Sequence, residues 1–119
     1  AGTLANLAAV VDRCRDAGVT SYVLDPGIGL WNPARNTALD WEICRNFGQC
    51  SRFGRPLLAA VSRKTFLGEP DGRPPDLRLA ASLGITALLI QKGADIVRTH
   101  DIRETAEVIR MAARVVDRP

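Results

Sequence analysis

The stretch Pro56-Leu-Leu-Ala-Ala-Val61 is followed at once by Ser62-Arg-Lys64. An unbroken apolar run of this length is typical of a β-strand that is covered on both faces, as strands of a parallel sheet are. The hydroxyl and the two cations that follow mark the place where the buried strand ends. The stretch therefore predicts a buried strand with polar chemistry at its carboxyl end.

The same arrangement occurs twice more along the chain. Ser21-Tyr-Val-Leu24 leads into Asp25-Pro-Gly-Ile-Gly29, and Ala94-Asp-Ile-Val97 leads into Arg98-Thr-His-Asp101. Polar residues at the carboxyl ends of successive buried strands are typical of an α/β-barrel active site.

The spacing of these residues predicts that they face a common pocket. Ser62 and Lys64 are two residues apart, as are Arg98 and His100. Alternate residues of an extended chain point to the same side, so each pair can face one site.

Apolar residues at helical spacing and glycine stop signals predict helices between these strands. The first contains Leu4, Leu7, Ala8 and Val11 and stops at Gly18. Three more are expected: Leu39 to Phe47 with a stop at Gly48; a helix with Leu79, Leu83, Ala87 and Ile90 on one face and a stop at Gly93; and Thr105 to Val116. Asp101 is expected to cap the last helix, with Glu104 as its reciprocal partner. The Gly- and Pro-rich segment 68–75 is expected to be a mobile loop.

Strands that alternate with helices indicate parallel pairing and an α/β fold. Three strands and four helices are too few for an eight-stranded TIM barrel, which needs about 250 residues. We therefore interpret residues 1–119 as about three βα units, the carboxyl-terminal part of such a barrel. An isolated piece would expose edges and apolar faces, so we expect either the rest of the barrel elsewhere or association of chains. The chain opens without a methionine, which fits a segment of a longer protein.

The composition excludes several classes of protein. The net charge of +3 is small and its basic residues are scattered, which argues against nucleic-acid binding. No apolar run approaches the roughly 20 residues of a membrane span, and no signal peptide opens the chain. Cys14, Cys44 and Cys50 form no CxxC pair and, with one histidine, make no zinc site. We expect a cytoplasmic protein with reduced cysteines.

Each strand end suggests a chemistry and has a plainer alternative. Asp25 could accept two hydrogen bonds from a flat heterocycle rich in N–H groups, or could only organise its own turn. Lys64 could donate to a ring carbonyl or nitrogen and Ser62 could bind a carboxylate, although a solvated basic turn is common. Arg98 and His100 are candidates for a phosphate site, since a guanidinium grips phosphate oxygens and an imidazole can donate or carry a proton, although a lone histidine is more often a structural hydrogen-bonding residue.

The ordered motifs "VLDPGIG", "VSRKTFLG" and "GADIVRTHDIRET" resemble the carboxyl-terminal half of dihydropteroate synthase, from about Ala17 to Val116. In that family they end strands six to eight of a TIM barrel. The resemblance implies a transferase of folate biosynthesis that condenses 6-hydroxymethyl-7,8-dihydropterin pyrophosphate with p-aminobenzoate or a related arylamine and releases pyrophosphate. The reaction is thought to pass through a pterin cation at the exocyclic carbon.

The resemblance also implies roles for single residues. Asp25 and Lys64 bind the pterin, Lys64 borders the aminobenzoate pocket, Ser62 and Arg63 lie near the aminobenzoate, and Arg98 and His100 bind the pyrophosphate. Lys64, Arg98 and His100 are the implied catalytic residues. Mg²⁺ is the implied cofactor, with its protein ligand outside this chain. The implied partners are the two small-molecule substrates, the amino-terminal half of the barrel and a second copy of the chain, without nucleic acid or membrane.

Two departures from the family pattern bear on function. Bacterial members usually have Gly-Phe-Gly-Lys after the DPG turn, where this chain has Gly29-Leu-Trp-Asn32. The "DPGIG-x-W" pattern is more similar to archaeal members, in which the amine substrate can differ. The residues that complete the pterin pocket lie on the first five strands, so we expect the isolated chain to be inactive.

Two other functions stay open at this point. One is a pterin-binding methyltransferase domain that acts with a corrinoid partner; the RTHD and SRK segments argue against it, because such a protein has no pyrophosphate to bind. The other is a non-catalytic domain that keeps this part of the fold for binding or assembly.

Overall fold

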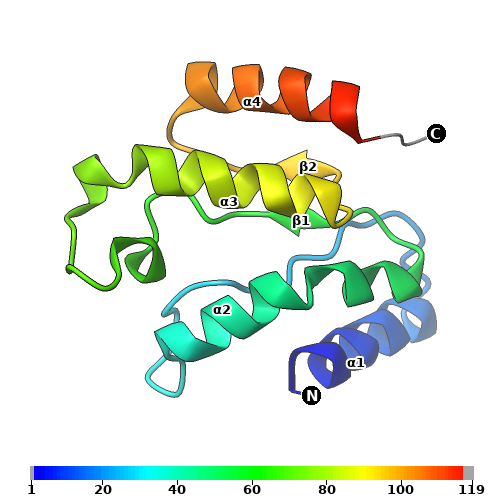
Figure 1. Cartoon of the computed structure of the whole chain (residues 1–119). Helices are drawn as coiled ribbons and strands as arrows, with labels where there is room; N and C mark the ends of the chain where they lie inside the picture. The colour runs from blue at the N-terminus through cyan, green and yellow to red at the C-terminus, as the bar shows by residue number, and fades with distance from the viewer. Residues whose placement is uncertain (1, 117–119) are drawn as a thin grey trace.

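The structure is a computed structural model that describes residues 2–116. The helices and strands follow one another in the order α1 (Gly2–Asp16), α2 (Thr37–Arg45), β1 (Leu58–Ala59), α3 (Leu79–Gln91), β2 (Ile96–Val97) and α4 (Ile102–Val115). Short 3-10 helices cover Phe47–Phe53, Thr65–Gly68 and Pro75–Leu77. Strands and helices therefore alternate through the second half of the chain, as the sequence predicts (Figure 1).

The strands are parallel and adjacent to one another. β1 pairs with β2 through Leu58 with Ile96 and Ala59 with Val97. The expected strand Ser21–Leu24 is reduced to a single parallel bridge between Leu24 and Leu57. Because Leu24 bonds to Pro56 and Leu58 on either side, it still fixes the direction in which the chain enters the turn at Asp25.

Helix α3 packs beside α4 and also contacts the short 3-10 helices Thr65–Gly68 and Pro75–Leu77 (Figure 1). Its most buried residues are Ser82, Thr86, Leu89 and Ile90, so the predicted face of Leu79, Leu83, Ala87 and Ile90 is only partly correct. Leu83 and Ala87 instead line an apolar groove against α4. The predicted pattern thus located the side of α3 that faces α4. It missed the more buried side, where Ser82 accepts a hydrogen bond from the Arg63 amide and Leu89 joins the core.

Helix α2 begins at an asparagine cap, since the Asn36 side chain accepts a hydrogen bond from the Leu39 amide at 2.9 Å. It ends at Arg45 rather than near the expected stop at Gly48. The chain tightens into the 3-10 helix Phe47–Phe53, and Gly54 ends that segment in a left-handed conformation. This continuation places Phe47 and Cys50 in the core.

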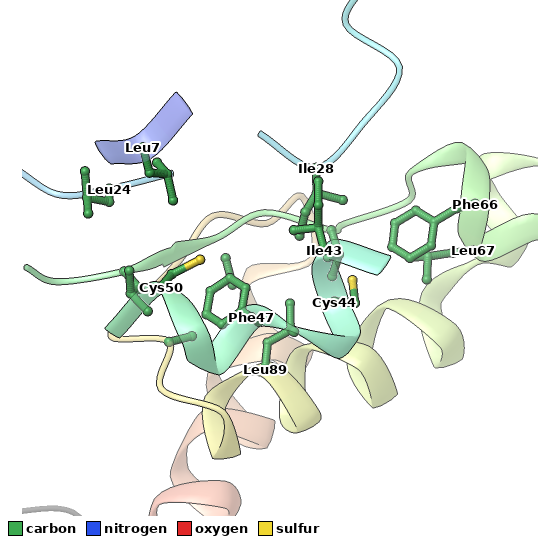
Figure 2. Close-up of a cluster of buried hydrophobic side chains, with 14 residues drawn as sticks. Leu7, Leu24, Ile28, Ile43, Cys44, Phe47, Cys50, Phe66, Leu67 and Leu89 are labelled. Atoms are coloured by element: carbon green, nitrogen blue, oxygen red, sulfur yellow. The ribbon is translucent and has the colours of Figure 1, made fainter. Parts of the chain in front are cut away.

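The core gathers side chains from α1, α2, the strands and α3 around Phe47, which is fully buried (Figure 2). Phe66 belongs to the same core and packs against α2, where its ring meets Trp41 edge to face with centroids 4.8 Å apart. Cys44 and Cys50 are buried and all cysteines are free thiols. Burial and the nearby Asp40 carboxylate raise the pKa of Cys44 to about 11.

The expected capping pair at α4 is wrong. Asp101 occupies the cap position, but its side chain makes no hydrogen bond to the helix. It instead accepts two hydrogen bonds from Arg63, at 2.6 and 3.1 Å. A bidentate guanidinium partner is stronger than a local amide donor, so the tertiary contact prevails.

The described part of the chain is a flat body of 43 × 37 × 20 Å. Its radius of gyration is 14.7 Å, against about 13.5 Å for a compact domain of this length.

None of the helices within residues 2–116 has the length and apolar character to cross a membrane.

Candidate active site

Two adjoining cavities lie at the carboxyl ends of the strands. The larger, about 720 Å³, is lined by residues of the 25–31 loop together with Arg63, Lys64, Thr65, Pro75, Arg78 and Arg98. The smaller, about 360 Å³, is lined by Ala60, Ser62, Lys64, Arg98, Thr99 and His100. Lys64 and Arg98 belong to both, so the structure brings together all of the strand-end residues that the sequence singles out.

Asp25 begins the first of these loops and shapes it. Its Oδ1 accepts a hydrogen bond from the Gly27 amide at 2.9 Å, so the turn-organising alternative describes one of its contacts. The carboxylate nevertheless lies at the wall of the larger cavity and is exposed. Asp25 can therefore hold its own turn and present negative charge to a ligand.

Lys64 crosses from the loop after β1 to the loop after Leu24. Its ammonium group donates to the Ile28 carbonyl. Burial lowers the pKa of Lys64 below its ordinary 10.5; the Asp25 carboxylate acts in the opposite direction, and Arg98 lowers it further. The side chain is thus a half-buried cation between a carboxylate and a guanidinium.

The glycine turn lies close to Lys64. A Cβ atom at Gly29 would make a tight contact of 3.3 Å with the lysine Nζ. The φ of Gly29 is +129°, a conformation that residues with a side chain rarely adopt, so the turn favours glycine at this position.

Ser62 and His100 form the hydrogen-bonded centre of the smaller cavity. The Ser62 hydroxyl lies 2.9 Å from His100 Nδ1 and accepts a hydrogen bond from the His100 backbone amide at 3.1 Å. The Thr99 hydroxyl reaches Ser62 at 3.4 Å and Thr105 at 2.9 Å. The network fixes the imidazole through Nδ1, while His100 and Arg98 are both exposed at the cavity.

Arg63 holds the two strand-end loops together. It has a left-handed φ of 57°, which is unusual for a residue with a side chain. Its amide donates to the Ser82 hydroxyl and its carbonyl accepts from Arg78, both at 2.9 Å. Its guanidinium pairs with Asp101, which raises the pKa of Arg63 and lowers that of Asp101.

Sequence reasoning missed the residues that support the glycine turn from behind. Asp40, which is 1% exposed, accepts a hydrogen bond from the Gly29 amide at 2.8 Å and lies 3.7 Å from the Arg35 guanidinium. Arg35 in turn donates to the carbonyls of Gly27 and Gly29. Both residues look like surface charges in the sequence, and only the long-range contact to the turn distinguishes them.

The comparisons with known proteins agree with this arrangement. A sequence model of the family described as pterin binding enzyme matches residues 3–100. The chain belongs to the pterin-binding enzyme family. It is 32% identical over 103 residues to dihydropteroate synthase of Escherichia coli K12, and 37% identical over 115 residues to that of Mycobacterium leprae. These matches cover 85% and 90% of the chain.

The chain spans well under half of the length of these relatives, 36% and 39% respectively. It likewise covers 44% of a dihydropteroate synthase from Coxiella burnetii solved with pteroic acid, with a TM-score of 0.90 and 30% identity. The match to the Yersinia pestis enzyme solved with a sulfonamide drug complex has a TM-score of 0.86 at 28% identity. Since these relatives are TIM barrels, this member of the pterin-binding family has the fold of part of such a barrel.

Proposed function

We propose that residues 1–119 form strands six to eight of a dihydropteroate synthase and supply part of its active site. The enzyme would join an arylamine to 6-hydroxymethyl-7,8-dihydropterin pyrophosphate and release pyrophosphate. The observation that carries this proposal is the convergence of Asp25, Lys64, Arg98 and His100 on two cavities that share a wall. The related dihydropteroate synthases support it.

The larger cavity suits the pterin. Its volume of about 720 Å³ lies within the range of small-molecule sites. Asp25 can accept hydrogen bonds from the ring N–H groups, and Lys64 can donate to a ring nitrogen or carbonyl. A carboxylate beside the ring also stabilises positive charge that develops on the pterin when the leaving group departs.

The smaller cavity suits the pyrophosphate. Arg98 offers a planar guanidinium that can grip two phosphate oxygens, and His100 presents its imidazole from the same strand end. Because the Ser62 hydroxyl is bonded to Nδ1, the opposite ring nitrogen is the atom that can meet the anion. Lys64 borders both cavities, so we assign it a position beside the oxygen on which negative charge develops when the carbon–oxygen bond breaks.

The bond changes follow from this placement. The nitrogen of the arylamine attacks the exocyclic carbon of the pterin, the bond from that carbon to the pyrophosphate oxygen breaks, and the oxygen keeps the electron pair. The attacking nitrogen then passes one proton to water or to the departing pyrophosphate. Asp25 stabilises the cationic carbon side, and Arg98 and His100 stabilise the anionic oxygen side.

The magnesium ion implied by the family resemblance is expected to have its protein ligand outside this chain. Residues 2–116 bring together no group of three or more His, Cys, Asp or Glu residues that could hold a metal ion. We therefore assign none of these residues as a metal ligand, and the steps above use the side chains of this chain alone.

Arg98→Ala tests the proposal at the leaving-group site. Titration calorimetry with pyrophosphate should show a loss of about 1.5–3 kcal/mol of binding free energy, as expected for a charge-assisted contact. Arg110→Ala, an exposed arginine of α4 outside both cavities, is the matched control and should bind normally. Equal pyrophosphate affinity in both variants would refute the assignment of Arg98. Methyl transfer to an added corrinoid would favour the methyltransferase alternative.

A further inference from the structure

Trp31 is unusually exposed for its size and lies at the larger cavity. Its exposed fraction is 64%, higher than the 48% of neighbouring Leu30, which lines the same cavity. It is also the one aromatic residue that lines this cavity within the described chain. An exposed indole at a binding cavity is a candidate contact for a ligand.

The indole is held in place although it is exposed. Its Nε1 donates to the Gly27 carbonyl at 2.7 Å, and the Arg35 guanidinium lies over the ring at 4.9 Å from the centroid. A ring fixed by a hydrogen bond and a cation–π contact has little rotamer freedom left to lose on binding. The indole of Trp31 is therefore a preformed contact surface for a ligand.

Arg35 can hold the indole because it is itself fixed. Its side chain is 9% exposed, lies beside the buried Asp40 and donates to the two glycine carbonyls of the turn. The second Asp40 oxygen has no hydrogen-bond partner, so the buried carboxylate attracts a cation strongly. The pair thus connects α2, the glycine turn and the indole.

The two substrates need different recognition. A pterin ring carries N–H, nitrogen and carbonyl groups at its edge, which Asp25 and Lys64 can meet. The benzene ring of an arylamine has no polar atom in the ring, so it can be recognised only through its apolar faces and edges. At this cavity, Trp31 offers the aromatic surface that such a ring requires.

We infer that Trp31 is a specificity-determining residue against which the arylamine ring packs, and that Arg35 is the residue that positions it. The inference rests on the proposed function, which supplies the arylamine. It assigns a role to Trp31, which stands where bacterial members of the family usually have the second glycine of Gly-Phe-Gly-Lys. It also gives the arylamine a contact on the 25–31 loop, separate from the groups proposed for the pyrophosphate.

Tryptophan fluorescence can test the inference directly. The chain has two tryptophans, so Trp41→Phe leaves Trp31 as the single reporter. p-Aminobenzoate should quench its emission, with and without pterin pyrophosphate, whereas 4-aminocyclohexanecarboxylate, which keeps the amine and the carboxylate but lacks the aromatic ring, should not. Equal quenching by the two ligands would overturn the inference.

Substitutions provide a second measurement. Trp31→Leu should weaken p-aminobenzoate binding in calorimetry by about tenfold, and Trp31→Phe by about threefold at most, because phenylalanine keeps an aromatic face. Unchanged affinity in Trp31→Leu would refute the contact. If that variant does not fold, judged by circular dichroism, the comparison of the two ligands on the Trp41→Phe protein still decides.

The role of Arg35 needs a readout that a merely structural role would not change. Arg35→Lys keeps a positive charge beside Asp40 but loses the planar stack, so the fluorescence anisotropy of Trp31 should fall. Arg55→Met is the matched control, because Arg55 stacks over Tyr22 at 4.4 Å and should leave Trp31 unchanged. Equal anisotropy in Arg35→Lys and the parent would refute the positioning role.

Pterin pyrophosphate binding separates this inference from the proposed function. If pterin pyrophosphate binds while Trp31→Leu keeps full affinity for p-aminobenzoate, the inference fails and the function stands. If p-aminobenzoate binding depends on Trp31 while pterin pyrophosphate does not bind, the aromatic contact stands and the proposed function fails. Absence of p-aminobenzoate binding to the parent chain would overturn the inference.

Discussion

Lys64 has an environment unlike that of an ordinary surface lysine. Its ammonium donates to the Ile28 carbonyl, and burial lowers its pKa. Lys92, the other lysine of the chain, is exposed. The chain therefore contains a natural pair for comparing a half-buried amine with an exposed one.

We expect Lys64 to become reactive toward an amine-acylating reagent at a lower pH than a free lysine derivative, because only the neutral amine reacts and burial favours the neutral form. Mass spectrometry of peptides labelled over a pH series gives the midpoint for Lys64 and for Lys92 in one sample. A Lys64 midpoint at or above that of the free derivative would contradict the lowered pKa.

The Arg63–Asp101 pair makes stability depend on pH in a direction that can be stated. Arg63 lowers the pKa of Asp101 below its ordinary 3.8, so the unfolded chain binds this proton first as the pH falls. The stabilisation of the folded chain by this ion pair is therefore complete above about pH 4. It is lost as the pH falls through the lower pKa that Asp101 has in the folded chain.

Asp101→Asn should remove this acid dependence and reduce stability at neutral pH, as measured by urea unfolding over a pH series. Asn keeps the preference for the cap position of α4, so the ion pair is the main loss. Asp12→Asn is the control, since its pair with Arg15 is exposed and contributes little. A constant difference between parent and Asp101→Asn down to the lowest pH would contradict the assignment.

At the scale of elements, replacing two glycines by alanine should have opposite effects on stability. Gly68 ends the 3-10 helix Thr65–Gly68, and a Cβ atom there would lie 2.7 Å from the Arg73 carbonyl oxygen. Gly84 lies inside α3 with open space around it. The same substitution therefore meets a backbone clash in one element and none in the other.

Gly68→Ala should destabilise the chain by about 1–3 kcal/mol, because backbone atoms must move to accept the methyl group. Gly84→Ala should stabilise it by about 0.5–1 kcal/mol, since alanine has the higher helix propensity. Chemical denaturation of both variants measures the two effects. Equal changes of the same sign would contradict the local geometry.

The sequence predicted the elements that follow a local rule. The apolar run Pro56–Val61 contains β1 and is mostly buried, as predicted, although Pro56 is exposed and only Leu58–Ala59 form the strand. The polar residues after each strand were also located correctly, because apolar length and strand ends are local properties. Asp101 occupies the predicted cap position, but its expected side-chain capping bonds were wrong because its partner, Arg63, is 38 residues away. The burial of Ser82 on α3 was missed because its hydroxyl accepts a hydrogen bond from the Arg63 amide, which belongs to another loop.

The supporting residues of the candidate site could not be predicted for the same reason. Arg35 and Asp40 stand among polar residues, and a charged residue in a short amphipathic helix is usually exposed. Their burial follows from the closure of the 25–31 loop over α2, which no local pattern encodes. The roles of Asp25, Ser62, Lys64, Arg98 and His100 in binding remain predictions, whereas their proximity is observed.

The whole molecule has open faces. Within residues 2–116, β2 pairs only with β1, and the flat body is 20 Å in its shortest dimension. Ile102, Met111 and Val115 of α4 are exposed, the last at 84%. Unpaired strand edges and exposed apolar side chains favour association with another chain.

We expect the purified 119-residue chain to self-associate as its concentration rises and to form no measurable dihydropteroate, because it supplies only part of each substrate site. Sedimentation velocity and a product assay measure the two properties. Adding the part of the Escherichia coli barrel that the chain does not match should lower self-association and produce turnover. The same mixture made with the Arg98→Ala chain should produce no turnover. Robust turnover by a monomer of the chain alone would refute the expectation.

The backbone bonds of Arg63 also set an order of assembly. Its left-handed conformation is held by Ser82 and Arg78, residues of α3 and its N-terminal boundary, so the loop after β1 cannot settle until that helix has docked. Folding of the loop after β1 should therefore be late and coupled to α3 as one cooperative unit. Native-state hydrogen exchange should show the Arg63 amide opening together with the α3 amides, and earlier opening of Arg63 alone would argue against this order.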